Sequence, residues 1–415
     1  MPRPARPFNA YPFSRHQELT VTVESLTNQG QGVAKIDLPD VQPALTGWVI
    51  FIPFTIPGEL VKIRIIRNQK KYSQAEVVEI IEPSPERVKP ACHLFTKCGG
   101  CQYQHISYPE QLKWKTQQVQ ELLARLAGVD HEVNPAIASP KEYSYRSKIT
   151  PHFHKPRNGK IHSIGFLSSR NQREILDVHQ CPIAMEEINT ALPAIREATF
   201  KSAKKHKSDT TLLLRAADGK VETNEATVIT EKVNDVTFHF LAGDFFQNNP
   251  FILPEFVNYA ASQSTLADTK FLVDAYCGSG LFALSLAKDF EKVAGVEISE
   301  TATDWARQNA RINDIENAHF LSASAEAIFA DIAFPATDTT VLIDPPRRGC
   351  SVEFLDQLFA FSPAQCVYIS CDPATQMRDL RSFIEAGYAV QDVQPFDLFP
   401  QTKHLECIIT LRKED

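Results

Sequence analysis

The sequence contains no long hydrophobic run. Its longest apolar segments, such as residues 48–54, are only as long as a strand, whereas a helix that crosses a bilayer needs roughly 20 apolar residues. The N-terminal segment also lacks the apolar core of a secretory signal, and its prolines oppose an amphipathic targeting helix. We therefore expect no membrane association and a cytoplasmic location.

The chain also lacks a net positive charge. Its 43 Lys and Arg residues against 50 Asp and Glu residues give a formal charge of −7, so a nucleic-acid partner has to be bound by a local basic patch. One such patch, interleaved with aromatic residues, contains Lys141, Arg146, Lys148, Lys155, Arg157, Lys160, Arg170 and Arg173, with Glu142 as its one acidic residue. A second basic cluster at residues 201–207 is more typical of a solvated loop.

No internal repeat or low-complexity tract is present, and 415 residues exceed the size of a single core. Short apolar segments separated by turn residues over positions 19–81 predict a small β-barrel, and a helical pattern follows over 108–128. We predict three domains: the barrel at 1–85, a mixed, strand-leaning central domain at 86–240, and an α/β domain at 241–415.

Strands and helices alternate from Lys270 onward. The predicted strands are 271–275, 293–296, 319–323, 340–343, 367–370, 390–395 and 405–411. The stretches 281–290, 301–313 and 375–386 between them are helix-like. This order predicts a doubly wound α/β sheet, whose ligand site lies beyond the carboxyl ends of the strands.

A glycine-rich turn, Asp274 to Gly280, joins the first of these strands to a helix. Glycines let the backbone approach a ligand at a helix N-terminus, which suits a nucleotide-like group. Glu297 ends the following strand, where an acidic side chain can bind ribose hydroxyls. Because residues 278–283 also fit a looser dinucleotide pattern, NAD stays an alternative on this motif alone.

A second strand ends in Asp344-Pro345-Pro346. An acid followed by two prolines is typical of methyltransferases that use S-adenosylmethionine, and dehydrogenases do not need it. An amino-methyltransferase is expected to carry an aromatic residue after the prolines, whereas Arg347 follows here. The motif therefore favours S-adenosylmethionine, with a plain strand-to-loop junction as the alternative.

The nine cysteines are odd in number, which in a chain without an export signal indicates ligands and nucleophiles over disulfides. Cys92, Cys98 and Cys101 have the spacing C-x5-C-x2-C, and Cys181 offers a fourth thiolate. Four thiolates suit either a tetrahedral zinc ion or an iron-sulfur cluster, and spacing does not choose between them. The glycines between the close pair and the proline after Cys181 fit a bulky cluster slightly better.

Cys371 follows an apolar segment and precedes a helix start at Asp372-Pro373, a position that can lower a thiol pKa. Glu406 lies at the start of the last apolar segment. A thiol and a carboxylate at strand ends are suited to adding to a pyrimidine ring and then removing its proton. Core packing is the alternative for Cys371, and it is the expectation for Cys366 and Cys407 within apolar strands.

Together these motifs resemble the 5-methyluridine RNA methyltransferases over nearly the whole chain. The barrel resembles the TRAM domain of RNA-modifying enzymes, and the α/β domain resembles a Rossmann-like class I methyltransferase domain. The cysteines resemble those of the family's large-subunit ribosomal RNA branch, which implies a [4Fe-4S] cluster on Cys92, Cys98, Cys101 and Cys181. S-adenosylmethionine is the implied cofactor, and the implied contacts are Gln247, Tyr276, Glu297, Ser324 and Asp344.

The resemblance also implies the reaction. Cys371 would add to C6 of uracil as the nucleophile, and Glu406 would accept the proton from C5. The target uridine has to be flipped out or unpaired, because C6 is hidden in a stacked helix. We expect an RNA partner and not DNA, ribosomal RNA ahead of transfer RNA, and a monomer. The alternatives are a transfer RNA uridine-54 enzyme, a non-catalytic iron-sulfur RNA-binding module, and an NAD-dependent oxidoreductase.

Overall fold

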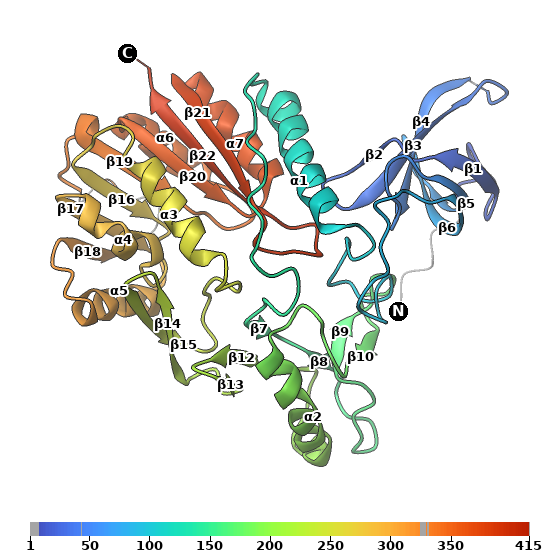
Figure 1. Ribbon diagram of the computed structural model, residues 1–415, viewed down its shortest axis with the longest axis horizontal. Helices are drawn as coiled ribbons and strands as arrows, with labels where there is room; N and C mark the ends of the chain where they lie inside the picture. Colours follow the sequence, from blue (N-terminus) through green and yellow to red (C-terminus); the bar gives the residue numbers. More distant parts are fainter. Residues whose placement is uncertain (1–7, 43, 324–328, 330–331, 415) are drawn as a thin grey trace. The chain divides into compact units, whose positions relative to one another are not determined.

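The computed structural model describes residues 8–42, 44–323, 329 and 332–414 (Figure 1). The chain divides into two compact units. The first unit comprises the N-terminal part up to Gln118 together with Gln401–Lys403, and the second comprises Val119–Pro400 together with the segment from His404. No helix in the described ranges combines the length and the apolar character needed to cross a bilayer.

The first unit contains a six-stranded sheet in the order β1-β5-β6-β4-β3-β2. Its strands are β1 (Glu18–Thr22), β2 (Ser25–Leu26), β3 (Gln31–Leu38), β4 (Leu45–Pro53), β5 (Leu60–Asn68) and β6 (Tyr72–Glu82). Alternate residues of β4 and β5, such as Ile50, Ile52 and Ile63, point into one core, as the two-residue period of a strand requires. The short strands predicted from the sequence are confirmed.

Helix α1 (Tyr108–Leu122) continues into a π-helical turn at Leu123–Ala127. It stops at Gly128, which has a left-handed φ of 71°, a conformation that glycine adopts without steric cost. The helix predicted over 108–128 is therefore confirmed.

The central part of the second unit is built from small sheets and one helix. Four short strands pair in the order β10-β9-β8-β11, three in the order β13-β12-β7, and β14 pairs with β15. The elements are β7 (Lys148–Ile149), β8 (His152–Phe153), β9 (Gly165–Leu167), β10 (Ile175–Asp177), α2 (Glu186–Lys201), β11 (Thr210–Thr211), β12 (Leu214–Ala217), β13 (Lys220–Glu222), β14 (Val228–Val233) and β15 (Val236–Leu241). This agrees with the mixed, strand-leaning prediction.

The C-terminal part of the second unit contains a seven-stranded sheet in the order β18-β17-β16-β19-β20-β22-β21. Its strands are β16 (Phe271–Ala275), β17 (Lys292–Glu297), β18 (Ala318–Ser322), β19 (Thr339–Ile343), β20 (Gln365–Ser370), β21 (Tyr388–Phe396) and β22 (Glu406–Lys413). The first five pair in parallel, whereas β22 runs antiparallel to both β20 and β21. The predicted strands and the doubly wound α/β fold are confirmed.

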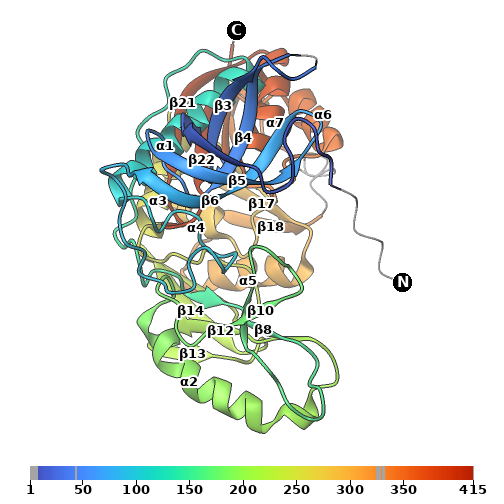
Figure 2. The same ribbon diagram turned by 90° about the vertical axis from the view of Figure 1, so that its right-hand side faces the viewer.

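Helices cover both faces of this sheet (Figure 1 and Figure 2). On one face α3 (Leu253–Ser264), α4 (Leu281–Ser285) and α5 (Glu300–Ile312) pack on side chains such as Leu272 and Ile369. On the other face α6 (Val352–Phe361) and α7 (Pro373–Glu385) pack on Val273 and Tyr368. Cys366 and Cys407 are fully buried in this second core, which confirms their expected packing role.

Candidate active site

The sheet order reverses between β16 and β19. The chain moves from β16 to β17 and β18 on one side, and to β19 and β20 on the other. The connections therefore diverge at the carboxyl ends of β16 and β19, which is where open α/β sheets bind ligands. Tyr276 and Asp344 follow these two strand ends, and the Asp344 amide donates to the Ala275 carbonyl at 3.4 Å. Glu297 lies at the end of β17 next to them.

The glycine-rich turn holds its conformation through positive φ angles at Tyr276 (65°), Gly278 (54°) and Gly280 (93°). The Glu297 carboxylate accepts hydrogen bonds from the amides of Gly278 at 3.2 Å and of Ser299 at 2.8 Å. A Cβ atom on Gly278 would meet no atom of the described chain within 4 Å. The turn thus presents an open backbone surface beside a fixed carboxylate, which fits the ribose-bearing part of a nucleoside cofactor.

Asp274 is a second carboxylate at this end of the sheet, and it is fully buried. One carboxylate oxygen accepts the Ala283 amide at 2.8 Å, and the other has no hydrogen-bond partner in the described part of the chain. Burial, with the charges of Asp344 and Glu297, holds the Asp274 pKa well above its usual range. The sequence analysis assigned no function to Asp274. The feature of the sequence that could have indicated one is a charged residue within an apolar strand, just before the glycine-rich turn.

Cys371 and Glu406 meet because β22 is antiparallel to β20. Ser370 pairs with Cys407, so the next pair beyond the end of β20 consists of Cys371 and Glu406. The Cys371 side chain is half-buried and Glu406 is 4% exposed. The structure therefore brings the predicted nucleophile and the predicted proton acceptor together where β20 ends and β22 begins.

The pKa of the Cys371 thiol is raised to about 12, because burial and the nearby carboxylates of Glu406 and Asp344 disfavour the thiolate. The expected lowering by the following helix start is wrong. The N-terminus of α7 is occupied by the Asp372 carboxylate, which accepts the amides of Ala374 at 3.1 Å and Thr375 at 3.4 Å. The helix end therefore stabilises the Asp372 charge and not the thiolate.

Asp344 and Glu406 both have raised pKa values, and the Asp344 charge contributes to the shift at Glu406. Burial raises the pKa of Asp344 to about 7. Burial and then the Asp344 charge hold the pKa of Glu406 well above its usual range. Arg347 opposes the shift at Glu406 by its charge, and it opposes the shift at Cys371 by its charge and a hydrogen bond. This guanidinium is therefore the group that favours both ionised forms, the thiolate and the carboxylate.

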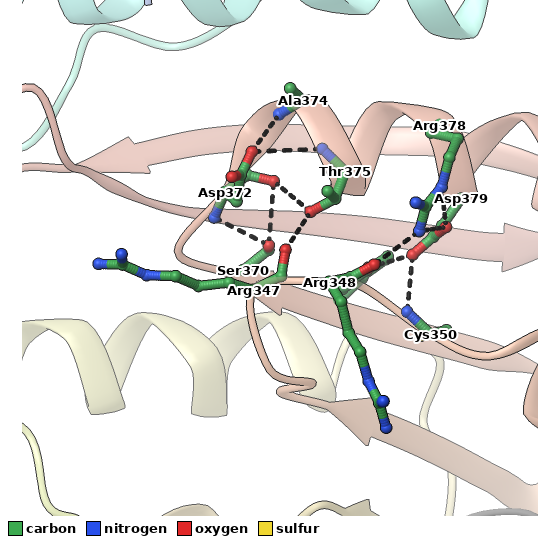
Figure 3. Close-up of polar contacts among 10 residues, drawn as sticks. Arg347, Arg348, Cys350, Ser370, Asp372, Ala374, Thr375, Arg378 and Asp379 are labelled. Carbon is green, nitrogen blue, oxygen red and sulfur yellow. Dashed lines mark hydrogen bonds and ion pairs between the residues drawn. The ribbon is translucent and has the colours of Figure 1, made fainter. Parts of the chain in front are cut away.

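The loop that carries Arg347 is fastened to α7 (Figure 3). The Thr375 hydroxyl donates to the Arg347 carbonyl at 3.0 Å, and the Arg378 guanidinium donates to the Arg348 carbonyl at 2.8 Å. Both donors lie on the helix that begins two residues after Cys371. The helix that follows Cys371 thus also holds the loop of the neighbouring cation, Arg347.

A buried carboxylate, Asp379, completes this fastening (Figure 3). It is 4% exposed on its side chain, forms an ion pair with Arg378 at 2.7 Å, and accepts the Cys350 amide and the Tyr368 hydroxyl at 2.8 Å each. A Cβ atom on Gly349 would lie 2.3 Å from an Asp379 carboxylate oxygen. The glycine is therefore required for the loop to approach α7 this closely.

Two family models match the chain. The model of the tRNA (uracil-5-)-methyltransferases matches residues 199–414, and that of the TRAM domain matches residues 12–78. The chain belongs to the tRNA (uracil-5-)-methyltransferase family. It is an S-adenosylmethionine-dependent RNA uracil-C5 methyltransferase, which removes the NAD-dependent oxidoreductase and the non-catalytic binding module from consideration.

Several relatives cover nearly the whole chain. A tRNA (uracil(54)-C(5))-methyltransferase of Schizosaccharomyces pombe is 39% identical over 97% of this chain and 79% of its own length. The enzyme of the same name from Saccharomyces cerevisiae is 32% identical over 96% of this chain and 74% of its own length. An uncharacterized RNA methyltransferase of Halalkalibacterium halodurans is 31% identical over 96% of this chain and 98% of its own length.

A solved structure shares the fold. The Pyrococcus abyssi tRNA (uracil-54, C5)-methyltransferase, in complex with S-adenosyl-L-homocysteine, has a TM-score of 0.71 and 24% identity. The match covers 95% of this chain and 100% of that one. The class I methyltransferase fold and the N-terminal TRAM domain of this methyltransferase are therefore as the sequence predicts.

The structure tests neither of the other two predicted cofactor contacts, Gln247 and Ser324. Gln247 is 8% exposed and lies in the loop between β15 and α3. Its neighbour Asn249 anchors that loop by donating to the Leu398 carbonyl and the Ser139 hydroxyl at 3.0 Å each. Ser324 lies outside the described residues. The roles of Gln247 and Ser324 stay predictions.

The predicted cluster ligands do not form a metal site in this structure. Across residues 8–42, 44–323, 329 and 332–414, no group of three or more His, Cys, Asp or Glu side chains could hold a metal ion. Burial and then the neighbouring Cys92 raise the pKa of Cys98, whose sulfur accepts the Gly100 amide at 3.4 Å. The assignment of a cluster to Cys92, Cys98, Cys101 and Cys181 stays a prediction, and no step of the reaction is assigned to one.

Proposed function

We propose that this chain methylates C5 of a uridine in transfer RNA, at the position that corresponds to uridine 54. Two relatives that are 39% and 32% identical to it carry the name tRNA (uracil(54)-C(5))-methyltransferase. The sequence analysis favoured ribosomal RNA as the substrate, but neither of these two relatives is named as a ribosomal RNA methyltransferase. The choice of transfer RNA therefore rests on relatedness, whereas the chemistry rests on the pairing of Cys371 with Glu406.

The first step is addition of the Cys371 thiolate to C6 of the uracil. A bond forms between sulfur and C6, and the electrons of the C5–C6 double bond become available at C5. Arg347 stabilises the thiolate that this step requires, against the shift of its pKa to about 12. C5 would then bond to the methyl group that S-adenosylmethionine supplies when it is bound, and the bond between that methyl group and the sulfonium sulfur would break to leave S-adenosylhomocysteine.

Elimination completes the reaction. Glu406 takes the proton from C5, the C5–C6 double bond is restored, and the sulfur–C6 bond breaks to release the thiolate. Glu406 has to be ionised for this step, so the charge of Arg347 favours it as well. Burial of Glu406 keeps water away from the proton that is transferred.

We assign cofactor binding to Tyr276, Glu297 and Asp344 at the strand ends, with Gln247 and Ser324 as further predicted contacts. The Glu297 carboxylate, already fixed by two backbone amides, is the proposed partner of the ribose hydroxyls. Asp344 supplies negative charge near the reacting centre. The domain limits 1–85, 86–240 and 241–415 are kept as part of this proposal.

The test is methylation of defined RNAs by the purified protein. An unmodified transfer RNA transcript should gain one 5-methyluridine at position 54, mapped by mass spectrometry, and a transcript with cytidine at that position should gain none. Methylation of large-subunit ribosomal RNA fragments, with no product on transfer RNA, would instead support ribosomal RNA as the substrate.

The [4Fe-4S] cluster stays a prediction of the resemblance alone. Analysis of protein purified without oxygen distinguishes the possibilities: about four irons and four sulfides per chain for the cluster, one zinc for a tetrahedral site, or neither. Absence of both iron and zinc would assign the four cysteines to structural packing.

A further inference from the structure

A basic cavity lies in the central part of the second unit, on elements other than those that carry Cys371. It has a volume of about 240 Å³ and is lined by His154, Lys155, Arg157, His162 and Ser163. Sites for drug-sized ligands are larger, about 300 to 1,000 Å³. The dimensions and the lining therefore suit a small anion, such as one phosphodiester group, better than a whole nucleoside.

A tight hairpin fixes one wall of the cavity. Arg157 and Lys160 exchange two backbone hydrogen bonds of 3.0 Å each. The two residues between them, Asn158 and Gly159, have φ angles of 52° and 74°, as a two-residue turn with both central residues left-handed requires. The backbone that carries Arg157 is thus held in one conformation.

His154, another lining residue, adds a further cationic group to the cavity. His154 Nε2 lies 2.7 Å from the Arg173 carbonyl, and Nδ1 lies 3.2 Å from the Asp209 carboxylate. Both ring nitrogens therefore face acceptors, which favours the doubly protonated imidazole. The Arg173 carbonyl first and Asp209 second raise the His154 pKa, against the opposing charge of Arg157.

Little negative charge neutralises these groups. The chain has no acidic residue between Glu142 and Glu174. Asp209 is already engaged, because it accepts the Lys155 amide at 2.8 Å in addition to its contact with His154. Within the ranges that the structure describes, neither Lys155 nor Arg157 has a carboxylate partner for its side chain.

The second basic cluster of the sequence, residues 201–207, packs against the same hairpin. A Cβ atom on Gly159 would lie 3.6 Å from the Lys204 side chain. The His206 ring packs edge-on against Phe153, with 4.9 Å between ring centroids. Figure 1 and Figure 2 show α2, which leads into this cluster, beside β8. The two basic stretches of the sequence therefore form one surface around the cavity.

We propose that this cavity binds a backbone phosphate of the RNA substrate, with Lys155 and Arg157 reaching the anion and His154 as a fixed cation beside them. The proposal rests on the proposed RNA-methylating function and adds a contact remote in the sequence from the reacting uridine's site. Contacts of this kind set the position and orientation of the nucleic acid and carry no sequence information.

The test is RNA binding by the double variant Lys155→Ala/Arg157→Ala across a range of salt concentrations. Its matched control is Lys232→Ala/Lys292→Ala, which removes two exposed lysines of β14 and β17 in the same unit. The cavity variant should bind a transfer RNA transcript several-fold more weakly. The slope of log K against log salt should fall by about one for each phosphate that the variant no longer neutralises. The control variant should keep the wild-type affinity for RNA and the wild-type salt slope.

Single substitutions separate charge from shape. Arg157→Lys keeps the cation and should keep the salt slope, whereas Arg157→Gln should lower it. Equal affinity and equal slope for the cavity variant and the control would overturn the proposal. A loss of affinity with an unchanged salt slope would overturn it too, because a phosphate contact must release counterions.

Failure of the proposed function would look different. In that case the wild-type protein would form no 5-methyluridine at position 54 of transfer RNA, whatever the cavity residues are. If the proposed function holds and only the cavity assignment fails, the wild-type protein methylates transfer RNA. The cavity variant then has the same KM for RNA as the control variant. If both hold, the cavity variant has a raised KM for RNA and a kcat that changes less.

Discussion

At the scale of single residues, the proposed reaction depends on the Cys371 thiol and the Glu406 carboxylate, which the pairing of β20 with β22 brings together. RNA with 5-fluorouridine at the target position should form a stable covalent complex through Cys371, because fluorine cannot leave as a cation.

Glu406→Gln should slow turnover about 100- to 10,000-fold and should trap a methylated covalent complex on ordinary RNA. Denaturing gels measure both complexes. Cys371→Ala should form neither while still binding RNA, and near-normal turnover by this variant would exclude the mechanism.

The pKa of Asp344, raised to about 7 by burial, predicts how cofactor binding depends on pH. Asp344 is neutral below its pKa and anionic above it, so affinity for the cationic sulfonium should rise with pH through about 7. The rise has a limit of about tenfold per pH unit. Calorimetry from about pH 6 to about pH 8 measures it. Asp344→Asn should bind more weakly with a flat profile, and an equally steep profile in that variant would assign the titration to another group.

Glu297 gives a residue-scale prediction that does not depend on pH. Glu297→Ala removes a carboxylate that two backbone amides already orient. It should weaken S-adenosylmethionine binding by about 1.5 to 3 kcal/mol, the usual contribution of a charge-assisted hydrogen bond. Unchanged affinity would show that this acid does not contact the ribose.

At the scale of elements, α7 begins next to the proposed nucleophile, Cys371, and holds the loop of Arg347. Asp379→Asn removes the charge that holds the Arg348–Cys350 loop on α7, and should cost about 1 to 3 kcal/mol of stability. Since Arg347 lowers the Cys371 pKa, a loosened loop should also move the rising limb of the pH–rate profile to higher pH. Glu385→Gln, on the exposed surface of the same helix, is the control. A stability loss without the alkaline shift would limit Asp379 to a structural role.

The element scale also shows what the sequence could and could not predict. The strands of the large sheet follow from apolar runs, and all seven are found close to their predicted limits. Helices α2, α3 and α6 had no counterpart in the prediction, although α6 begins with a capping serine, Ser351, and α3 has a proline in its first turn. The place of β22 between β20 and β21 could not be predicted, because register between distant segments leaves no local pattern.

At the scale of the whole molecule, a chain of formal charge −7 binds a polyanion. Its affinity for RNA must therefore come from local basic surfaces and should fall steeply with salt. For a protein with six to ten phosphate contacts the loss is about 10³- to 10⁵-fold between about 50 and 200 mM salt. Affinity for S-adenosylmethionine should change little over the same range. A shallow salt dependence for RNA would mean that base stacking, and not phosphate contact, dominates the complex.

One expectation at the site is wrong, and another stays a prediction. The Cys371 pKa was expected to fall because a helix starts beside it. The structure shows that Asp372 caps that helix and that burial and two carboxylates dominate. The cysteine spacing predicted four ligands, yet the described side chains form no metal site. The sequence shows Asp372 beside Cys371, but it does not show the burial of the thiol or its closeness to Glu406 and Asp344, which are distant along the chain.

The antiparallel strand β22 comes last among the described strands but lies in the interior of the sheet, hydrogen-bonded to β20 and β21. Glu406 reaches Cys371 only when this strand is in place. Under the proposed mechanism, a folding intermediate without β22 has a thiol and no base, and it cannot complete the reaction. The first appearance of methylated RNA during refolding would therefore show when β22 has joined the sheet. The activity of the enzyme can thus be used to measure the rate of this folding step.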